Sequence, residues 1–250
     1  MKQIRKLLVL LFGLKFYLKL VSKTYILLTN MGFMRKKYPE LFYLDTLIQP
    51  DWICIDIGAN LGYYSNRIGR KLTTGKLYAV EPIPLFAEVW KSNLANSKCT
   101  KELLNIALGD ENKAVTMSIP IRNGVVRHGL TKIDDEKSNS DKKAMSFEVS
   151  MKKSGEVFHD LDKIDFIKID VEGYEQYVLK SLISCLEKNH PIIQAELSGE
   201  ENKNNSYQLL TSIGYQAFRL INNKLTPFSE KELSSLAQDV YFIHSSQPLN

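Results

Sequence analysis

Two glycines and an aspartate lie close together in the sequence, at the point where a buried strand is predicted to turn into a helix. The apolar run WICIDIGAN predicts the strand, and it leads into DIGANLG at residues 56–62. Gly58 and Gly62 allow the backbone to approach a ligand closely and to adopt unusual dihedral angles. Asp56 brings a negative charge to this turn, which would repel a bound pyrophosphate and attract a cationic group. The turn therefore indicates a site for a positively charged ligand.

A second acid ends the next predicted strand, KLYAVEP. A carboxylate at Glu81 can accept hydrogen bonds from both ribose hydroxyls of an adenosine. The alternative is a solvated loop glutamate, but Pro82 stiffens the strand exit and favours an ordered Glu81. A dinucleotide site would need G-x-G-x-x-G, and Asn60 stands in place of the second glycine; the nucleotide loop G-x-x-x-x-G-K-[ST] does not occur. The adenosyl sulfonium of S-adenosylmethionine fits these acids better.

A further acidic cluster follows a later strand, in IDFIKIDVEGYE. Asp170 and Glu172 flank one residue, so in an extended chain their carboxylates face the same side as Lys168. Gly173 then permits a sharp turn into a helix. Acids at this position can also satisfy the free amides of the helix start and suit its macrodipole, which is the structural alternative to a role in catalysis.

A hydroxyl that attacks a methyl sulfonium needs a base to take its proton. Asp170 and Glu172 are the first candidates, and His128, a lone loop histidine of near-neutral pKa, is the third. The two carboxylates could instead hold a divalent cation that lowers the pKa of a sugar hydroxyl. No C-x-x-C or H-x-x-H spacing occurs, so no dedicated metal site is predicted.

Strand and helix patterns alternate after Pro50, which is typical of an α/β fold with a doubly wound, mostly parallel sheet of about seven strands. We expect one domain over residues 46–250, preceded by a helical extension over residues 1–45. Beyond the strands named above, we expect helices over Leu61–Lys71, Leu85–Asn96 and Asn204–Ile213, strands over Lys101–Leu108, Ala114–Ile119 and Phe147–Met151, a loop over Arg122–Lys143, and an antiparallel edge hairpin of Tyr215–Leu220 with Asp239–His244.

The N-terminal segment differs in charge from the rest of the chain. Residues 1–38 carry nine of the 33 Lys and Arg residues and no acid, although the whole chain has a net charge of only +5. The apolar run LLVLLFGL is followed by Lys15, Lys19 and Lys23 on one helical face. These lysines interrupt the ~20 apolar residues that a membrane-spanning helix needs. We therefore expect a basic amphipathic helix.

Two interpretations of this helix remain open. It could lie on an anionic membrane surface with its lysines toward the headgroups, or it could pack on the domain or on a second subunit. The further bases at positions 35–37 favour peripheral membrane contact through residues 1–38. No basic stripe crosses the rest of the chain, so no nucleic-acid partner is expected. A cytoplasmic location, peripheral at the inner face of the membrane, fits three scattered cysteines that read as reduced thiols: Cys54, Cys99 and Cys185.

Four motifs together resemble the FkbM-type methyltransferase family. They are D-x-G-A-N-x-G at residues 56–62, the pair Glu81 and Pro82, the turn ALGD at residues 107–110, and IKIDVEGYE at residues 167–175, with Glu196 ending the following strand. The motifs follow one another in the order expected of a single parallel-sheet domain. The resemblance implies a Rossmann-like class I methyltransferase fold, S-adenosylmethionine as the donor, and O-methylation of sugars or related hydroxyls.

The resemblance also implies residue roles. Asp170 and Glu172 would lie near the acceptor, although the T-L-D-like stretch that family members often carry before this strand is replaced here by MKKSG at residues 151–155. Residues bordering the donor, its ribose and its adenine would be Asp56, Gly58, Ala59, Asn60, Gly62, Glu81, Pro82, Asn105 and Ala107.

We therefore expect an S-adenosylmethionine-dependent O-methyltransferase whose acceptor is a small molecule or glycan, with the hydroxyl on a sugar, a glycan or a lipid-linked saccharide. One rival is an NAD-dependent oxidoreductase on the same Rossmann-like sheet, and Asn60 and Asp56 count against it. The other rival is a catalytically decayed, membrane-associated binding protein, and the intact Asp56 and Glu81 count against that.

Overall fold

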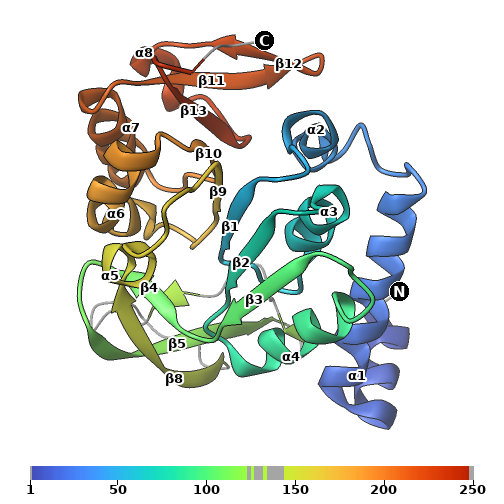
Figure 1. The fold of residues 1–250 in the computed structure, drawn as a ribbon. Helices are drawn as coiled ribbons and strands as arrows, with labels where there is room; N and C mark the ends of the chain where they lie inside the picture. The colour runs from blue at the N-terminus through green and yellow to red at the C-terminus, as the bar shows by residue number, and fades with distance from the viewer. Residues whose placement is uncertain (1, 123–124, 127–131, 134–143, 248–250) are drawn as a thin grey trace.

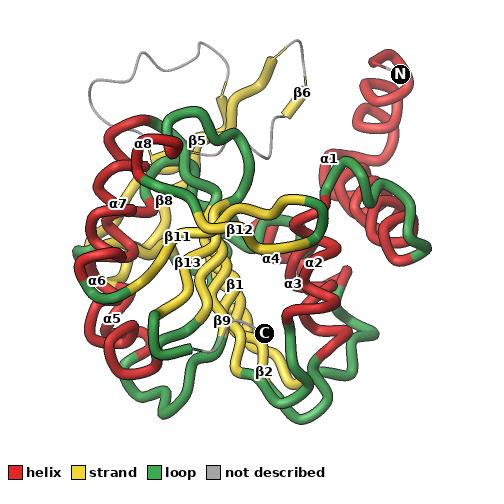
Figure 2. Tube along the Cα trace, turned by 90° about the horizontal axis from the view of Figure 1, so that it is seen from above, coloured by secondary structure: helices red, strands yellow, loops and turns green. Residues whose placement is uncertain are grey.

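The computed structural model describes residues 2–122, 125–126, 132–133 and 144–247. Within these residues, an eight-stranded sheet runs through the middle of the molecule, and a five-stranded sheet lies beside it (Figure 1). Helices cover both faces of the larger sheet (Figure 2). The predicted α/β fold with a mostly parallel sheet is confirmed.

The central sheet reverses its strand order beside its first strand. Its order is β12 (Lys224–Pro227), β11 (Tyr215–Ile221), β13 (Val240–His244), β10 (Ile192–Ala195), β9 (Phe166–Ile169), β1 (Ile53–Ile57), β2 (Lys76–Val80) and β3 (Thr100–Leu104). The five strands from β10 to β3 run parallel. The chain passes from β1 to β2 and β3 and later returns to the other side of β1 with β9. In open α/β sheets, ligands bind outside the carboxyl ends of the strands at such a reversal.

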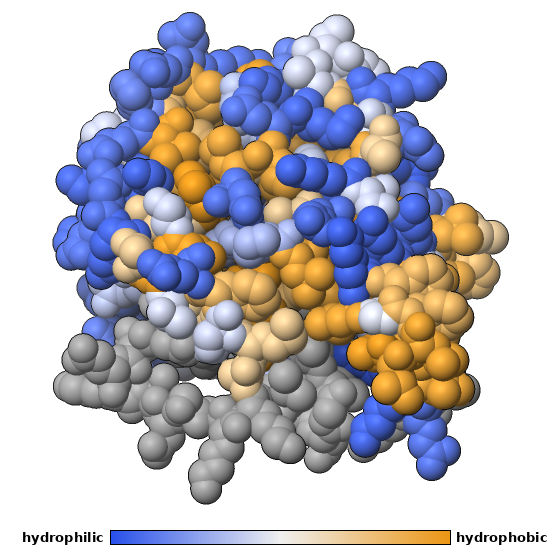
Figure 3. Space-filling model, turned by 90° about the horizontal axis from the view of Figure 1, so that it is seen from below, coloured by the Kyte–Doolittle hydropathy of each residue, from blue (hydrophilic) through white to orange (hydrophobic). Residues whose placement is uncertain are grey.

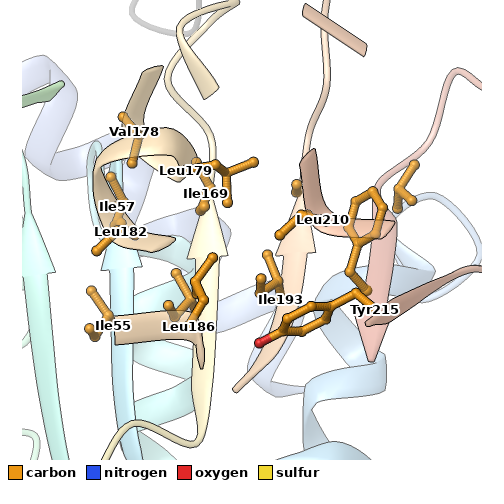
Figure 4. Close-up of a cluster of buried hydrophobic side chains, with 14 of the residues drawn as sticks. Ile55, Ile57, Ile169, Val178, Leu179, Leu182, Leu186, Ile193, Leu210 and Tyr215 are labelled. Atoms are coloured by element: carbon orange, nitrogen blue, oxygen red, sulfur yellow. The ribbon is translucent and has the colours of Figure 1, made fainter. Parts of the chain in front are cut away.

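Alternate side chains of each strand point to opposite faces of the sheet, so two separate cores form. Ile55 and Ile57 of β1 belong to the first core, which Figure 4 shows with Leu182 among its members. Cys54 belongs to the second core. The first core is covered by α5 (Ser154–Phe158), α6 (Glu175–Asn189), α7 (Glu200–Ser212) and α8 (Glu230–Leu233), and the second by α2 (Pro39–Leu47), α3 (Tyr63–Lys71) and α4 (Pro84–Asn93). By the same alternation, Asp56 faces the side of α3.

The segment predicted as one strand over Lys101–Leu108 divides between the two sheets. After β3, Asn105 and Ile106 lead the chain out of the central sheet and into the smaller one. The predicted loop over Arg122–Lys143 contains two short strands that pair with β5, and its other residues from position 123 on lie outside the described part of the chain. The smaller sheet consists of β4 (Ala107–Gly109), β8 (Ala144–Lys153), β5 (Lys113–Arg122), β6 (Val125–Val126) and β7 (Lys132–Ile133).

The C-terminal hairpin is not at the edge of the sheet. The strands β11 and β13 are antiparallel neighbours, as predicted, but β13 lies inside the sheet between β10 and β11. Four of the five residues of β13, VYFIH, are buried, so this strand needs neighbours on both sides. The edge is β12, which is short, polar and ends in Pro227, a residue that edge strands tolerate. The additional strand brings the sheet to eight strands instead of about seven.

The N-terminal helix packs on the domain along half of its length. This helix, α1 (Lys2–Asn30), bends at Gly13, where φ is 80° and ψ is 161°. Beyond the bend, Leu18 and Ser22 are buried, and the Asn93 amide of α4 donates a hydrogen bond to Ser22 Oγ (2.8 Å). The Arg67 guanidinium of α3 donates to the carbonyl oxygen of Thr29 (3.2 Å). Residues 1–45 therefore pack against residues 46–250, since Leu18 of α1 belongs to the core between α4 and the smaller sheet and Leu41 of α2 belongs to the second core. The division at residue 45 stays a prediction.

Two features of the fold bear on the predicted location of the protein: the state of its cysteines and the character of its helices. Its three cysteines, Cys54, Cys99 and Cys185, are buried thiols. No helix in the described part of the chain combines the length and the apolar character that crossing a bilayer requires. The location at the inner face of a membrane stays a prediction.

Truncation of α1 residues tests this docking. Leu18 is 1% exposed, so Leu18→Ala should lower the free energy of unfolding by about 2–4 kcal/mol through lost burial and a residual cavity. Leu20, 43% exposed on the same helix, is the matched control, and Leu20→Ala should change stability by about 0.5 kcal/mol or less. Urea denaturation measures both. Equal effects of the two substitutions would show that α1 does not pack on the domain in solution.

Candidate active site

The turn that follows β1 is pressed against the loop that follows β9. The amides of Gly58 and Ala59 donate hydrogen bonds to the carbonyl oxygen of Val80 (3.0 and 2.9 Å), which holds the turn to the tip of β2. Gly58 has a φ of 80°, and a Cβ there would lie 1.8 Å from the carbonyl oxygen of Asp170. Only glycine therefore allows the tips of β1 and β9 to approach this closely where the strand order reverses.

Gly62 serves helix packing. It is the N-cap of α3 with a φ of 88°, and a Cβ there would lie 2.8 Å from Leu94 Cδ1 and 2.9 Å from Trp90 Cδ1. Its lack of a side chain lets α3 begin close against α4. The structure thus gives Gly62 a role in helix packing, and its predicted place beside the donor stays a prediction.

Glu81 is buried behind the same turn. Its two carboxyl oxygens accept hydrogen bonds from the backbone amides of Asn60 and Ile83 (2.8 Å each). Burial raises the pKa of Glu81 to about 8, and these two hydrogen bonds oppose the shift. A solvated loop glutamate, the alternative considered above, does not describe a side chain that is 4% exposed. Each oxygen keeps a further lone pair that could accept a hydrogen bond from a ribose hydroxyl. This contact stays a prediction.

The residues predicted beside an adenine support this strand tip. The Asn105 side-chain amide donates to the carbonyl oxygens of Glu81 (2.6 Å) and Pro82 (3.0 Å). Ala107 is 5% exposed and packs in the core between α4 and the smaller sheet. The structure thus gives both residues structural contacts, and their contact with the donor stays a prediction.

A cavity of about 450 Å³ opens at the carboxyl ends of β1 and β9. Tyr25 comes from α1, and Tyr38 and Leu41 come from the start of α2, so the N-terminal helices form one wall. The ring of Tyr25 lies with its centroid 4.5 Å from that of Tyr63 and 5.5 Å from that of Tyr38. The complete lining is Tyr25, Tyr38, Leu41, Asp56, Gly58, Ala59, Asn60, Tyr63, Tyr64, Lys168, Asp170, Glu172 and Glu196.

A row of buried polar side chains crosses the sheet at this cavity. Strand register pairs Asp56 with Lys168, and Lys168 with Gln194. All three side chains are at most 2% exposed. Lys168 Nζ lies 3.5 Å from Asp239 Oδ2, and the Gln194 amide donates to the same oxygen (2.7 Å). The network holds the ammonium group in the middle of the sheet.

Lys168 keeps its charge because carboxylates surround it. Burial lowers the pKa of a lysine, but Asp239 and Asp170, followed by Glu196 and Asp56, raise the pKa of Lys168 above its ordinary value. The ammonium group also lies 4.9 Å from the centroid of the Tyr64 ring. One ammonium group therefore partly balances the negative charge of several acids at the cavity.

Asp56 is one of these acids, and the side of α3 holds it. Burial raises the pKa of Asp56 to about 6, while the Ser65 hydroxyl, which donates to its carboxylate, and the charge of Lys168 lower it. The Trp90 indole donates in turn to Ser65 Oγ (2.8 Å). The negative charge expected at this turn is thus anchored by α3 and α4.

Asp170 and Glu196 form a carboxyl pair at the tips of β9 and β10. Burial raises the pKa of Asp170, and Lys168 opposes that shift. Burial and then the charge of Asp170 raise the pKa of Glu196 to about 7. A hydrogen bond joins the two side chains, so the pair binds one proton near neutral pH. From the sequence, Glu196 was predicted only as the end of a strand.

Glu172 and Glu175 lie close in sequence but have different surroundings. Glu172 lines the cavity together with Asp170, although its φ of 55° shows that the chain is no longer extended there. The Glu175 carboxylate accepts hydrogen bonds from the amides of Val171 (3.0 Å) and Gly173 (3.1 Å). Glu175 therefore satisfies amides of the loop that leads into α6, whereas the amide of Gln176 in the first turn donates to Asn202 Oδ1 (2.9 Å).

Two further expectations concern a third candidate base and a metal ion. His128 lies outside the described residues. Over the part of the chain that the structure describes, no group of three or more His, Cys, Asp or Glu side chains is arranged to hold a metal ion. The residues predicted for the site did not include Gln194, Asp239 or the cavity tyrosines. The signal available for Gln194 was a polar residue inside the buried strand IIQA, which requires a partner.

The fold and the site define a doubly wound, Rossmann-like α/β protein with an acidic crevice at its strand-order reversal. The family described as "Methyltransferase FkbM domain" matches residues 56–220. The chain belongs to this FkbM methyltransferase family, and the resemblance inferred from four motifs is confirmed.

Individual relatives are distant. Methyltransferase sdnD from Sordaria araneosa is 28% identical over 153 residues, which are 51% of this chain and 59% of that protein. The chain thus spans less than two thirds of that relative's length. A crystal structure of methyltransferase FkbM from Methylobacillus flagellatus KT is 15% identical with a TM-score of 0.49, covering 78% of this chain and 44% of that one. A SAM-dependent O-methyltransferase from Thermotoga maritima is 13% identical with a TM-score of 0.43, covering 86% and 67%.

Removal of the buried cation tests the charge network. Lys168→Met should lower the free energy of unfolding by about 3–5 kcal/mol, because acids such as Asp239 lose their counter-charge. Without the ammonium group, the buried acids bind protons more tightly in the folded than in the unfolded chain. Stability should therefore fall as the pH rises, and the loss should be larger at pH 8 than at pH 6. Urea denaturation at both pH values measures it, with the exposed Lys180→Met as control; a loss equal at both pH values would contradict the network.

Proposed function

We propose that this protein transfers the methyl group of S-adenosylmethionine to a hydroxyl oxygen of a sugar-like acceptor. The observation that carries the proposal is that two acids, Asp170 and Glu196, line a cavity beside the strand-order reversal of a methyltransferase-family fold; burial raises the pKa of both carboxyl groups, that of Glu196 to about 7. A carboxyl pair that titrates near neutral pH suits a base for an alcohol.

The residues of the crevice fit the donor. The sulfonium and amino groups of S-adenosylmethionine are cationic, and Asp56 and Asp170 supply negative charge at the same strand tips. The close-packed turn at Gly58 presents backbone atoms to the crevice without a side chain in the way. Glu81 fixes that turn through the Asn60 amide and remains the candidate acceptor for the ribose hydroxyls.

The transfer step needs positioning and a proton acceptor. When bound, the donor supplies an electrophilic methyl carbon. The acceptor oxygen forms the new bond to this carbon, the carbon–sulfur bond breaks, and its electron pair stays on sulfur. The hydroxyl proton passes to the carboxylate pair of Asp170 and Glu196. Holding acceptor and donor in line can account for about 7–11 kcal/mol of the barrier, and the base for about 10²–10⁴ in rate.

The cavity wall favours a polyhydroxylated acceptor. Tyr25, Tyr63 and Tyr64 offer aromatic surfaces on which the carbon–hydrogen faces of a sugar ring can pack, while the carboxylates can accept hydrogen bonds from its hydroxyls. Burial raises the pKa of all three tyrosines, which keeps them neutral hydrogen-bond donors. A dinucleotide fits less well, because its pyrophosphate would face Asp56 and Asp170.

Substitution of the carboxyl pair tests the proposal. Asp170→Asn should lower kcat by about 10²–10⁴-fold, because the hydroxyl proton loses its acceptor. Binding of S-adenosylmethionine, measured by calorimetry, should weaken far less than kcat falls, because Asp56 still supplies negative charge at the crevice. Wild-type kcat should rise as the pH increases through about 7, where Glu196 loses its proton, and this rise should disappear in Glu196→Gln. Transfer of labelled methyl groups to a panel of saccharides measures the rates.

Glu172→Gln is the matched control, since Glu172 lines the same cavity without belonging to the pair. It should retain the pH dependence of the wild type. Full activity in Asp170→Asn would remove the carboxyl pair from the mechanism.

The pH dependence of donor binding tests Glu81 separately. The pKa of Glu81 is about 8 in the free protein, and ribose hydroxyls donate to the ionised carboxylate. Bound donor should therefore lower this pKa. The affinity should rise with pH by up to about tenfold per unit below pH 8 and level off above it. Calorimetry from pH 6.5 to 8.5 measures the effect; Glu81→Gln should bind more weakly with a flat profile, and a sloping profile in this variant would assign the dependence to another group.

A further inference from the structure

Exposed apolar side chains gather on the N-terminal helix and the turn that follows it. Among the described residues, all exposed large hydrophobic side chains except Tyr177 and Ile221 lie between residues 7 and 34. Figure 3 shows them as an orange patch on the side of the molecule where α1 lies. Six of them define what we call the outer face: Leu10, Leu11, Phe16, Leu20, Leu27 and Phe33, exposed by 43–81%.

The outer face is distinct from the face that packs on the domain. In the part of α1 beyond Gly13, Phe16, Leu20 and Leu27 recur at spacings of four and seven and so form one stripe. Leu18 and Ser22, which are buried, lie on the opposite side of the helix. The stripe is therefore not needed to hold α1 in place.

The charge around this face selects its partner. Residues 1–38 contain nine Lys and Arg residues and no acid. Lys15 pairs with Glu88 of α4, whereas Lys23 and residues 35–37 are exposed beside the apolar side chains. A second copy of the chain would bring two such basic surfaces together, and like charges across a symmetric interface repel each other. A bilayer surface with anionic headgroups offers acyl chains for the apolar stripe and negative charge for its rim.

We propose that the outer face binds the surface of a bilayer that carries anionic headgroups. The bent helix lies in the interface with Phe16, Leu20 and Leu27 among the acyl chains, and the lysine stems extend to the headgroups. Tyr25, on the same helix, lines the cavity. Tyr25 lies on the side of α1 opposite the stripe, so membrane binding through α1 would place this wall of the cavity one helix diameter, ~10 Å, from the bilayer surface.

Vesicle co-sedimentation of the full chain tests this proposal. The protein should sediment with vesicles of 70% phosphatidylcholine and 30% phosphatidylglycerol, and at least tenfold more weakly with phosphatidylcholine alone or in 0.5 M salt. Replacing Phe16, Leu20 and Leu27 together by serine should weaken binding at least tenfold. Ile221→Ser, an exposed apolar residue on β11, is the matched control and should bind as the wild type does.

Two measurements keep the outcome independent of folding and of the proposed function. The triple variant should keep the circular dichroism spectrum and the S-adenosylmethionine affinity of the wild type, since its three side chains are exposed. Vesicle binding uses no donor, so it can fail while methyl transfer stands, and the reverse. The proposal is overturned if the triple variant sediments like the wild type, if neutral vesicles bind equally well, or if light scattering shows a dimer that the three serines dissociate while vesicles do not bind.

Discussion

Lys168 is a single ammonium group buried in the central sheet, and the site depends on its attraction to the acids around it. Parallel strand register sets it between Asp56 and Gln194, and Asp239 approaches from the position just before β13. Carboxylates outnumber the cation, so the acids cannot all be ionised at little cost in a buried setting. The excess negative charge favours a shared proton between Asp170 and Glu196. The same imbalance makes the crevice attractive to a cationic donor.

The backbone imposes a second constraint, which links the donor side to the acceptor side. The turn after β1 is held to β2 by the Val80 carbonyl oxygen and to Glu81 through the Asn60 amide. Gly58 brings the same turn against the Asp170 carbonyl, so a displacement of one strand tip would displace the other. A methyl transfer needs the sulfur, the methyl carbon and the attacking oxygen in line, and rigid strand tips provide such alignment better than independent loops.

The N-terminal helix joins the cavity to the surface of the molecule. One of its faces is buried against α4 through Leu18 and Ser22, and Tyr25 reaches the cavity. Its other face remains apolar and basic, with Phe16 and Lys23 exposed. One face of the helix is thus observed to pack on the domain, and contact of the other face with a membrane remains our proposal.

Local sequence patterns accounted for much of the fold and for half of the site. Alternating apolar runs determined a doubly wound sheet, and the motifs around Asp56, Glu81 and Asp170 marked the tips of three strands, because turn residues and strand ends follow from near neighbours in the chain. Apolar periodicity did not separate β3 from β4, nor reveal that VYFIH enters the sheet interior, since both depend on which strands pair. Tertiary structure alone decided that Glu196 joins Asp170, that Asp239 meets Lys168, and that Tyr25 closes the cavity. Those contacts join residues far apart in sequence, and a carboxylate's pKa or a tyrosine's role depends on the neighbours that only folding provides.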